Sequence, residues 1–172
     1  MDFGDYVHQR RPALMRFATV LTGQAWLADD LVSDVLARAF ERWDHIAGLD
    51  QPHAYVRRMI VNEFLSFRRR RRRTAPHEDV EPYLPELGDG AEQRAERELM
   101  LARLSQLPRK QRAAVVLRYY AGLSDAEIAS ELGCRDSTVR SQIARALATL
   151  RLQDDAGQPI RPVPDRAFQE IR

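Results

Sequence analysis

The stretch from Leu123 to Leu150, "LSDAEIASELGCRDSTVRSQIARALATL", decides how the chain folds. Ser124 is followed three residues later by Glu127. This is the pattern of a capping box, in which the serine oxygen and the glutamate side chain satisfy free amides at the start of a helix. The short helix that begins there contains the small residue Ala129 and ends at Gly133, and glycine tolerates the left-handed conformation of a tight turn. The first half of the stretch therefore predicts a capped helix that leads into a turn.

A longer amphipathic helix is predicted after the turn. Its apolar residues recur at intervals of three and four and are expected to be buried: Val139, Ile143, Leu147 and Leu150. The exposed face then presents Ser137, Thr138, Arg140, Ser141 and Arg145. Such side chains reach phosphates and base edges in a major groove, so the stretch predicts a DNA-binding helix-turn-helix. The alternative is a cluster of helices whose arginines are only solvated.

Apolar periodicity also predicts helices in the first part of the chain. One covers about residues 2–21 and is expected to be interrupted near Pro12, because proline removes a backbone hydrogen bond. A second runs over about residues 25–43, with Phe40 in its apolar stripe. Residues 44–53 contain glycine and proline and are predicted to form a loop.

A third helix is predicted from about residue 54 into the run of six arginines that ends at Arg73. The residues expected to face inward are Val56, Met59, Ile60, Phe64 and Phe67. Basic residues alternate here with aromatic and amide side chains: Tyr55, Arg57, Arg58, Asn62 and Arg68. This combination suits phosphate neutralisation together with stacking on unpaired bases. A solvated helix end is the alternative for the arginine run.

Charge is segregated along the 172 residues, although the net charge is only +2. Residues 57–73 hold eight arginines and one acid, whereas residues 74–98 hold eight acids and two arginines. Prolines and glycines interrupt the acidic part. We therefore predict an all-α chain of two small helical domains, residues 1–73 and 96–152, joined by an acidic flexible linker over 74–95. The polar residues 153–172 are expected to form a loose C-terminal tail.

Several classes of function find no support in the sequence. Cys134 is the single cysteine, which excludes an internal disulfide and a multi-cysteine zinc site. The four histidines are scattered, and there is no glycine-rich phosphate loop. No apolar run approaches the roughly 20 residues that a bilayer-spanning helix needs. We therefore expect a cytoplasmic protein that is not an enzyme, needs no cofactor or metal and does not insert into a membrane.

Three blocks, in this order, resemble the bacterial RNA polymerase sigma factors of the extracytoplasmic-function group, particularly its sigma-E-like subfamily. The blocks are "LADDLVSDVLARAFERWDHI", "AYVRRMIVNEFLSFRRRRR" and "LSQLPRKQRAAVVLRYYAGLSDAEIASELGCRDSTVRSQIARALATLR". The resemblance covers about residues 5–152. It implies a factor that binds core RNA polymerase, recognises promoter DNA and directs its melting and the initiation of transcription. It also implies silencing by an anti-sigma factor.

The resemblance assigns a role to each group of candidate residues. The polymerase-binding residues would be Asp29, Asp30, Asp34, Arg38 and Phe40, on a helix similar to the one that docks on the polymerase clamp. Reading of the minus-10 element would fall to Tyr55, Arg57, Arg58, Asn62 and Arg68. The minus-35 element would be bound by the helix-turn-helix, through Ser137, Thr138, Arg140, Ser141 and Arg145. The chain departs from the family where Asn62 is followed by "EFLSF", since members typically have a form like Asn-x-x-x-Asp.

Two alternatives to the sigma-factor interpretation make different predictions. A stand-alone helix-turn-helix regulator would bind its operator tightly without polymerase, whereas a sigma factor would bind poorly until assembled. An enzyme acting on nucleic acid would need a cluster of metal ligands or an activated nucleophile, and the sequence shows neither. The acidic linker is interpreted as a nucleic-acid mimic that threads a positively charged polymerase channel, or alternatively as a solvated tether.

Overall fold

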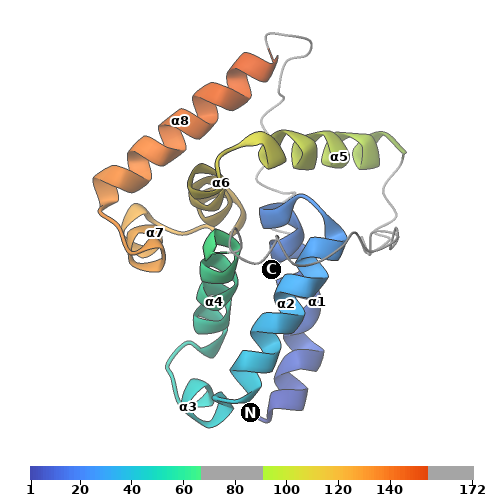
Figure 1. Ribbon diagram of the computed structural model, residues 1–172, viewed down its shortest axis with the longest axis vertical. Coiled ribbons are helices and arrows are strands. Elements are labelled where there is room, and N and C mark those ends of the chain that lie inside the picture. The colour runs from blue at the N-terminus through green and yellow to red at the C-terminus, as the bar shows by residue number, and fades with distance from the viewer. Residues whose placement is uncertain (67–90, 155–172) are drawn as a thin grey trace. The chain divides into compact units, whose positions relative to one another are not determined.

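The computed structural model describes residues 1–66 and 91–154, and the regular structure in both ranges is helical. This confirms the predicted all-α fold. The chain divides into two compact units, Met1–Pro85 and Glu86–Arg172. The first contains α1 (Phe3–Thr22), α2 (Ala25–Phe40), α3 (Trp43–Ala47) and α4 (Pro52–Ser66). The second contains α5 (Ala91–Gln106), α6 (Arg109–Val115), the π-helical turn η2 (Val116–Tyr120), α7 (Asp125–Leu132) and α8 (Asp136–Asp154) (Figure 1).

In the first unit α1 and α4 both pack against α2. The side chains between these helices are almost completely buried and include Leu14, Leu21, Val32, Val35, Ile60 and Val61. Burying each such side chain contributes about 1.5–3 kcal/mol. The α1–α2 corner is fixed by Gly23, which adopts φ 77° and donates its N–H to the Thr19 carbonyl. This packing holds α2 and α4, which carry candidate functional residues.

The predicted interruption of the first helix at Pro12 is wrong. Helix α1 continues through Pro12, which lies on the exposed side. Tyr6 before it and Leu14 after it are both buried, at 1% exposure. Packing on both sides of the proline therefore offsets the hydrogen bond that it removes, a cost of about 3 kcal/mol in a helix interior.

The predicted loop over residues 44–53 is also wrong in part. Helix α2 ends at Phe40, earlier than expected, and a separate short helix, α3, starts at Trp43. The Trp43 indole N–H donates to the Met1 carbonyl at 3.0 Å, and the Trp43 and Ile46 side chains are buried. The Phe40 side chain is 65% exposed, so it does not belong to the buried stripe in which it was placed.

The second unit contains the predicted helix-turn-helix. Ser124 and Glu127 form the capping box at the start of α7, with both reciprocal hydrogen bonds present. Gly133 ends α7 in the left-handed conformation, at φ 61°. Helix α8 packs on α6 and α7 through buried residues that include Val139, Ile143, Ala146 and Leu150, while Leu147 is only half-buried.

A buried arginine organises the turn between α5 and α6. The Arg112 guanidinium donates hydrogen bonds to the carbonyls of Ser105 and Leu107, so it caps the end of α5. Burial, with a smaller effect of Arg109, lowers the pKa of Arg112 to about 10, and the group stays charged at neutral pH. Helix α5 begins at Ala91, inside the segment predicted as linker. The rest of that segment, Phe67, Arg68 and the tail from residue 155 lie outside the described residues.

Candidate functional site

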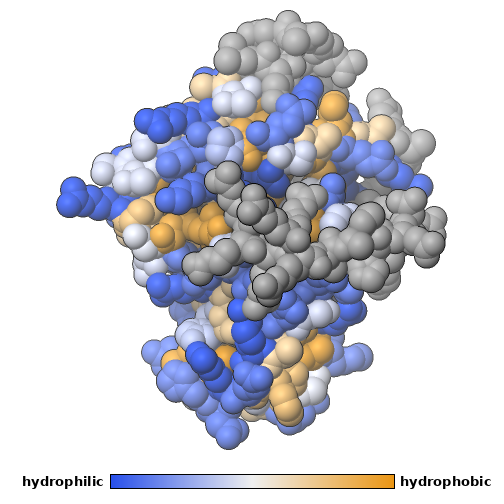
Figure 2. Space-filling view, in the orientation of Figure 1, coloured by the Kyte–Doolittle hydropathy of each residue, from blue (hydrophilic) through white to orange (hydrophobic). Residues whose placement is uncertain are grey.

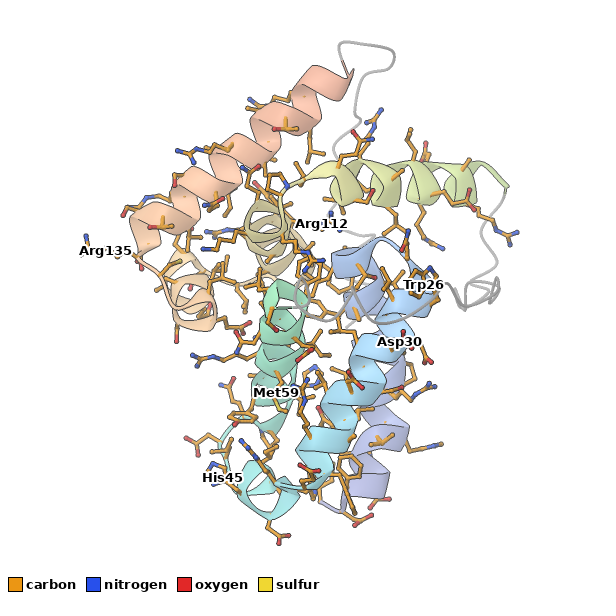
Figure 3. All side chains as sticks on the ribbon, in the orientation of Figure 1. Trp26, Asp30, His45, Met59, Arg112 and Arg135 are labelled. Atoms are coloured by element: carbon orange, nitrogen blue, oxygen red, sulfur yellow. The ribbon has the colours of Figure 1, made fainter. Side chains whose placement is uncertain are left out.

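One face of α4 lines a hollow of about 410 Å3 in the first unit. Its lining residues are Tyr55, Met59, Asn62, Glu63 and Ser66 from α4 and Arg38 and Arg42 from α2. The hollow therefore brings together two of the residues predicted to contact the minus-10 element, Tyr55 and Asn62. It does not include Arg57 or Arg58, which lie elsewhere on the same helix. Figure 3 labels Met59, at the middle of this face.

An ion pair joins the two helices at this hollow. Arg38 Nη2 lies 2.6 Å from Glu63 Oε2, and the Glu63 side chain is only 10% exposed. The Arg38 Nε–H also donates to the Asp34 carbonyl at 3.2 Å. Arg38, predicted as a polymerase-binding residue, is thus also a link from α2 to α4. Glu63 was not among the predicted site residues, although an acid between the inward-facing Ile60 and Phe64 could have indicated a buried pair.

The three predicted aspartates of α2 lie on its exposed side. Asp29 forms an ion pair with Arg11 of α1 at 2.9 Å, and both side chains are about half-exposed. Asp30 and Asp34 are one helical turn apart and therefore share a face. Figure 3 shows Asp30 on α2. The structure brings acidic groups together along α2, and Arg11 partly neutralises Asp29.

An aromatic cluster continues this surface beyond the end of α2. The Phe3 ring lies 5.1 Å from Phe40 and 5.2 Å from Trp43, and Tyr6 lies 4.7 Å from Trp43. Hydrophilic residues cover most of the face seen in Figure 2. The large apolar side chains exposed in the described part of the chain are Met1, Trp26, Phe40, Leu99 and Tyr119. Phe40 is thus an accessible apolar group supported from behind by other rings.

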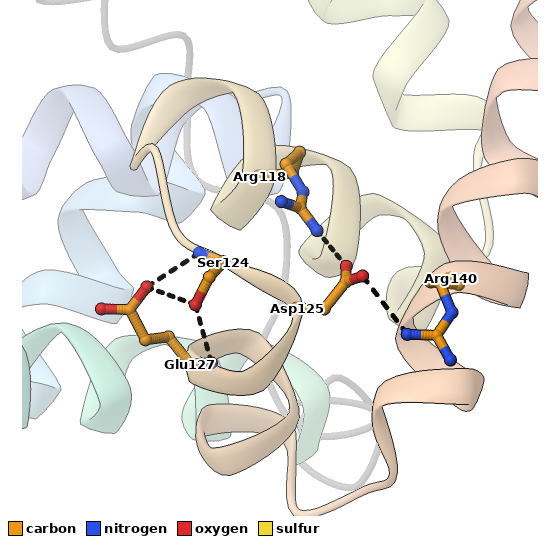
Figure 4. Close-up of polar contacts among 5 residues, drawn as sticks. All are labelled: Arg118, Ser124, Asp125, Glu127 and Arg140. Atoms are coloured by element: carbon orange, nitrogen blue, oxygen red, sulfur yellow. Dashed lines mark hydrogen bonds and ion pairs between the residues drawn. The ribbon is translucent and has the colours of Figure 1, made fainter.

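The face of α8 carries the five residues predicted to contact the minus-35 element, and all five are exposed: Ser137, Thr138, Arg140, Ser141 and Arg145. The Ser141 hydroxyl donates to the Thr138 carbonyl at 2.9 Å. Arg140 is not isolated, because its Nη1 lies 3.6 Å from the Asp125 carboxylate, which also contacts Arg118 (Figure 4). Asp125 and Arg118 were not singled out from the sequence. Their contacts join α7, η2 and α8, which no periodicity predicts.

The described residues contain no grouping of three or more histidine, cysteine, aspartate or glutamate side chains suited to a metal ion. Among the same residues, no helix combines the length and the apolar character needed to cross a bilayer.

The sequence of this chain matches known families over most of its length. Residues 6–74 match sigma-70 region 2, and residues 97–150 match sigma-70 region 4. Over 152 residues the chain is 38% identical to the RNA polymerase sigma-E factor of Streptomyces coelicolor, covering 88% of this chain and 85% of that protein. It is 33% identical over 151 residues to the ECF RNA polymerase sigma factor SigL of Mycobacterium tuberculosis, covering 81% of each.

Solved structures of similar fold include a sigma factor. One is the sigma factor RpoE in complex with the anti-sigma factor NepR from Bartonella quintana. It has a TM-score of 0.67 and 27% identity, and the match covers 91% of this chain and 99% of that one. Another is CnrH in complex with the cytosolic domain of CnrY, with a TM-score of 0.62 and 25% identity over 91% of this chain and 89% of that one.

The chain belongs to the sigma-70 family, within its ECF group. It is an RNA polymerase sigma factor that directs promoter recognition and the initiation of transcription. The sigma factor family is not enzymatic. The first unit carries region 2 and the second carries region 4.

Proposed function

We propose that the exposed face of α8 binds the minus-35 element as double-stranded DNA. The residues lie in the amino-terminal half of the second helix of a helix-turn-helix, the part that contacts base edges in such motifs: Ser137, Thr138, Arg140, Ser141 and Arg145. Arginine can form two hydrogen bonds with guanine or bind phosphate, and the hydroxyl groups can bind either phosphates or bases. The observation that supports this role is the exposure of all five side chains.

The hollow beside α4 is the proposed site for the minus-10 element. Tyr55 offers a ring for stacking, and Asn62 offers an amide for the edge of an unpaired base. Arg57, Arg58 and Arg68 would neutralise the strand's phosphates. Flipping a base out of a duplex costs a few kcal/mol, and this combination of stacking and charge offsets that cost.

Helix α2 is the proposed polymerase-binding element. Its residues are Asp29, Asp30, Asp34, Arg38 and Phe40, which combine an acidic face with an accessible aromatic ring. Arg38 remains 42% exposed while paired with Glu63, so a partner can still reach it. A basic surface on core polymerase would complement the aspartates and guide assembly.

We also propose functional divisions, a cellular compartment and a regulator for this chain. The functional divisions are residues 1–73 for polymerase and minus-10 binding, 74–95 for the linker, 96–152 for minus-35 binding and 153–172 for the tail. The factor acts in the cytoplasm, where core polymerase and promoter DNA are found. An anti-sigma factor is its proposed regulator, supported by the two structural relatives, which are both described with their partners.

A run-off transcription assay tests these assignments together. The purified chain is added to core polymerase from the source organism with sheared genomic DNA, and transcript starts are sequenced. Discrete starts preceded by a shared two-part element are expected. A stand-alone regulator would instead bind DNA tightly without polymerase and produce no such starts.

A further inference from the structure

Asp125 lies between two arginines from different helices of the second unit. It is the first residue of α7. One carboxylate oxygen is in close contact with Arg118 Nη2 of η2, and the other lies 3.6 Å from Arg140 Nη1 of α8 (Figure 4). The side chains of Asp125 and Arg118 are 26% and 30% exposed, whereas that of Arg140 is 62% exposed. The carboxylate is therefore anchored by the more buried Arg118 and faces the more exposed Arg140 of the proposed DNA-binding face.

We propose that Asp125 is a positioning residue that holds Arg140 ready for DNA and that Arg118 sets how firmly it does so. This inference rests on the proposed role of the α8 face in binding the minus-35 element. Arg140 would remain the residue that touches DNA. Asp125 would act through Arg140 without contacting a base itself.

The distances indicate that Asp125 restricts the position of the Arg140 side chain without fixing it. At 3.6 Å the Arg140 contact is longer than a normal hydrogen bond, so the guanidinium is attracted by the carboxylate but can move. A guanidinium has five N–H donors, and this contact involves only one of its nitrogens, which leaves donors for a base or phosphate. Restricting a long side chain before binding lowers the entropy lost when DNA arrives.

The tight contact with Arg118 makes this arrangement compatible with DNA. An unpaired carboxylate beside the α8 face would repel phosphates and would compete with them for Arg140. Because Arg118 shares the charge of Asp125, the pull on Arg140 is weakened. Removal of Arg118 should therefore leave Arg140 held too strongly, so that specific binding falls although Arg118 itself touches no base.

Holoenzyme transcription from a promoter library tests the proposal. The upstream element of the library is randomised, and transcripts are sequenced for wild type, Asp125→Asn, Arg140→Ala and the double variant. Wild type should select an element, and Arg140→Ala should lose the preference at particular base pairs. Asp125→Asn should lower the preference at the same base pairs by about three- to tenfold, while binding to unrelated DNA stays equal or rises. In the double variant, Asp125→Asn should cause no loss of preference beyond that of Arg140→Ala alone.

A second variant, Arg118→Met, retains Asp125 and the apolar stem of residue 118. Arg118→Met should also lower the preference at the base pairs that Arg140→Ala affects. The double variant Arg118→Met with Asp125→Asn should show the same preference as Asp125→Asn alone. Circular dichroism of each variant checks that the helices are retained.

Three results would overturn the positioning role. The first is that Asp125→Asn keeps the wild-type base-pair preference in the upstream element, although Arg140→Ala changes this preference. Another is an equal effect of Asp125→Asn with and without Arg140. The third is a uniform loss of binding to all sequences together with a lower melting temperature, which would make Asp125 only structural. If wild type itself selects no upstream element, the proposed function fails, and the positioning role fails with it.

Discussion

Three polar or charged side chains buried in the described part of the chain have specific hydrogen-bond or ion-pair partners. Thr19, Glu63 and Arg112 are polar or charged residues buried within the described ranges. The Thr19 hydroxyl donates to the Met15 carbonyl at 2.9 Å, Glu63 pairs with Arg38, and Arg112 caps the end of α5. A buried polar group without a partner costs about 1–3 kcal/mol, so each pairing removes a penalty that the helix packing would otherwise carry.

His53 is a half-buried residue whose protonation should affect the stability of the first unit. Its Nδ1 lies 3.3 Å from the Tyr6 hydroxyl. Burial, together with the smaller effect of the positive charges of Arg10 and Arg57, lowers the pKa of His53 from 6.5 to about 4. Burial also raises the pKa of Tyr6 to about 12, so at neutral pH both partners are uncharged.

Replacement of His53 by glutamine should reduce the acid sensitivity of this unit. In the unfolded chain the imidazole binds a proton below pH 6.5, whereas in the folded chain it resists protonation until about pH 4. Wild type therefore loses stability as pH falls from 6.5 towards 4, and a variant without the imidazole lacks this loss. Discounted for solvent at the half-buried ring, the difference should be about 1 kcal/mol.

Tryptophan fluorescence can measure this difference, because both tryptophans, Trp26 and Trp43, belong to the first unit. Urea unfolding of wild type and His53→Gln is compared at pH 7 and at pH 4.5. His8→Gln, at an exposed position of α1, is the control and should follow wild type. Parallel loss of stability in wild type and His53→Gln would contradict the assignment.

At the scale of the helices, the capping box at α7 should determine how often that helix opens. Ser124 accepts from the Glu127 amide, and the Glu127 carboxylate accepts from the Ser124 amide at 2.8 Å. Ser124→Ala removes the side-chain cap, which costs about 1 kcal/mol. Native-state hydrogen exchange of the α7 amides should then be about fivefold faster.

Ser130→Ala is the matched control for this change, since Ser130 is an exposed serine inside the same helix. It should leave the α7 amides as protected as in wild type, because alanine is at least as favourable as serine within a helix. Equally faster hydrogen exchange of the α7 amides in both variants would show that the Ser124 cap does not specifically stabilise α7.

Sequence patterns predicted the elements that depend on local signals. The capping box, the Gly133 turn and the spacing of Val139 and Ile143 are such signals, and the helix-turn-helix was predicted from them. Helix α3 was missed because it is short and is held by distant contacts, such as the Trp43 indole with the Met1 carbonyl. Helix α1 likewise continues through Pro12 because residues before and after the proline are buried. The helix propensities of single residues do not include this burial.

The two proposed binding faces differ from the sequence prediction in the same way: some of their features follow from local patterns, and others depend on contacts between distant residues. The exposure of the α8 polar residues follows from helical periodicity, as does the acidic side of α2. The ion pairs that modify them do not, because Arg38 and Glu63 are 25 positions apart, Arg11 and Asp29 are 18 apart, and Arg140 and Asp125 lie on separate helices. A sequence pattern predicts which residues are available, and packing determines which of them are paired.

At the scale of the whole molecule, two charged faces lie on two separate units. The acidic face of α2 belongs to the first unit, and the basic face of α8 belongs to the second. If the first binds polymerase and the second binds the minus-35 element, substitutions should separate the two activities. Coulomb interactions of exposed charges are screened beyond about 10 Å at 0.1 M salt, so each face acts locally.

Asp30→Lys with Asp34→Lys should lower affinity for core polymerase by about 100-fold or more, because like charges would then face each other across the interface. Asp44→Lys with Asp50→Lys makes the same change of net charge at exposed positions outside α2 and should assemble normally.

Arg140→Ala with Arg145→Ala should retain assembly with core polymerase and lose transcription that depends on the minus-35 element. Binding is measured by fluorescence anisotropy of labelled chain with core polymerase, and transcription by run-off. Unchanged assembly of the lysine variant would refute the role of α2, and joint loss of both activities in the alanine variant would refute the separation of faces.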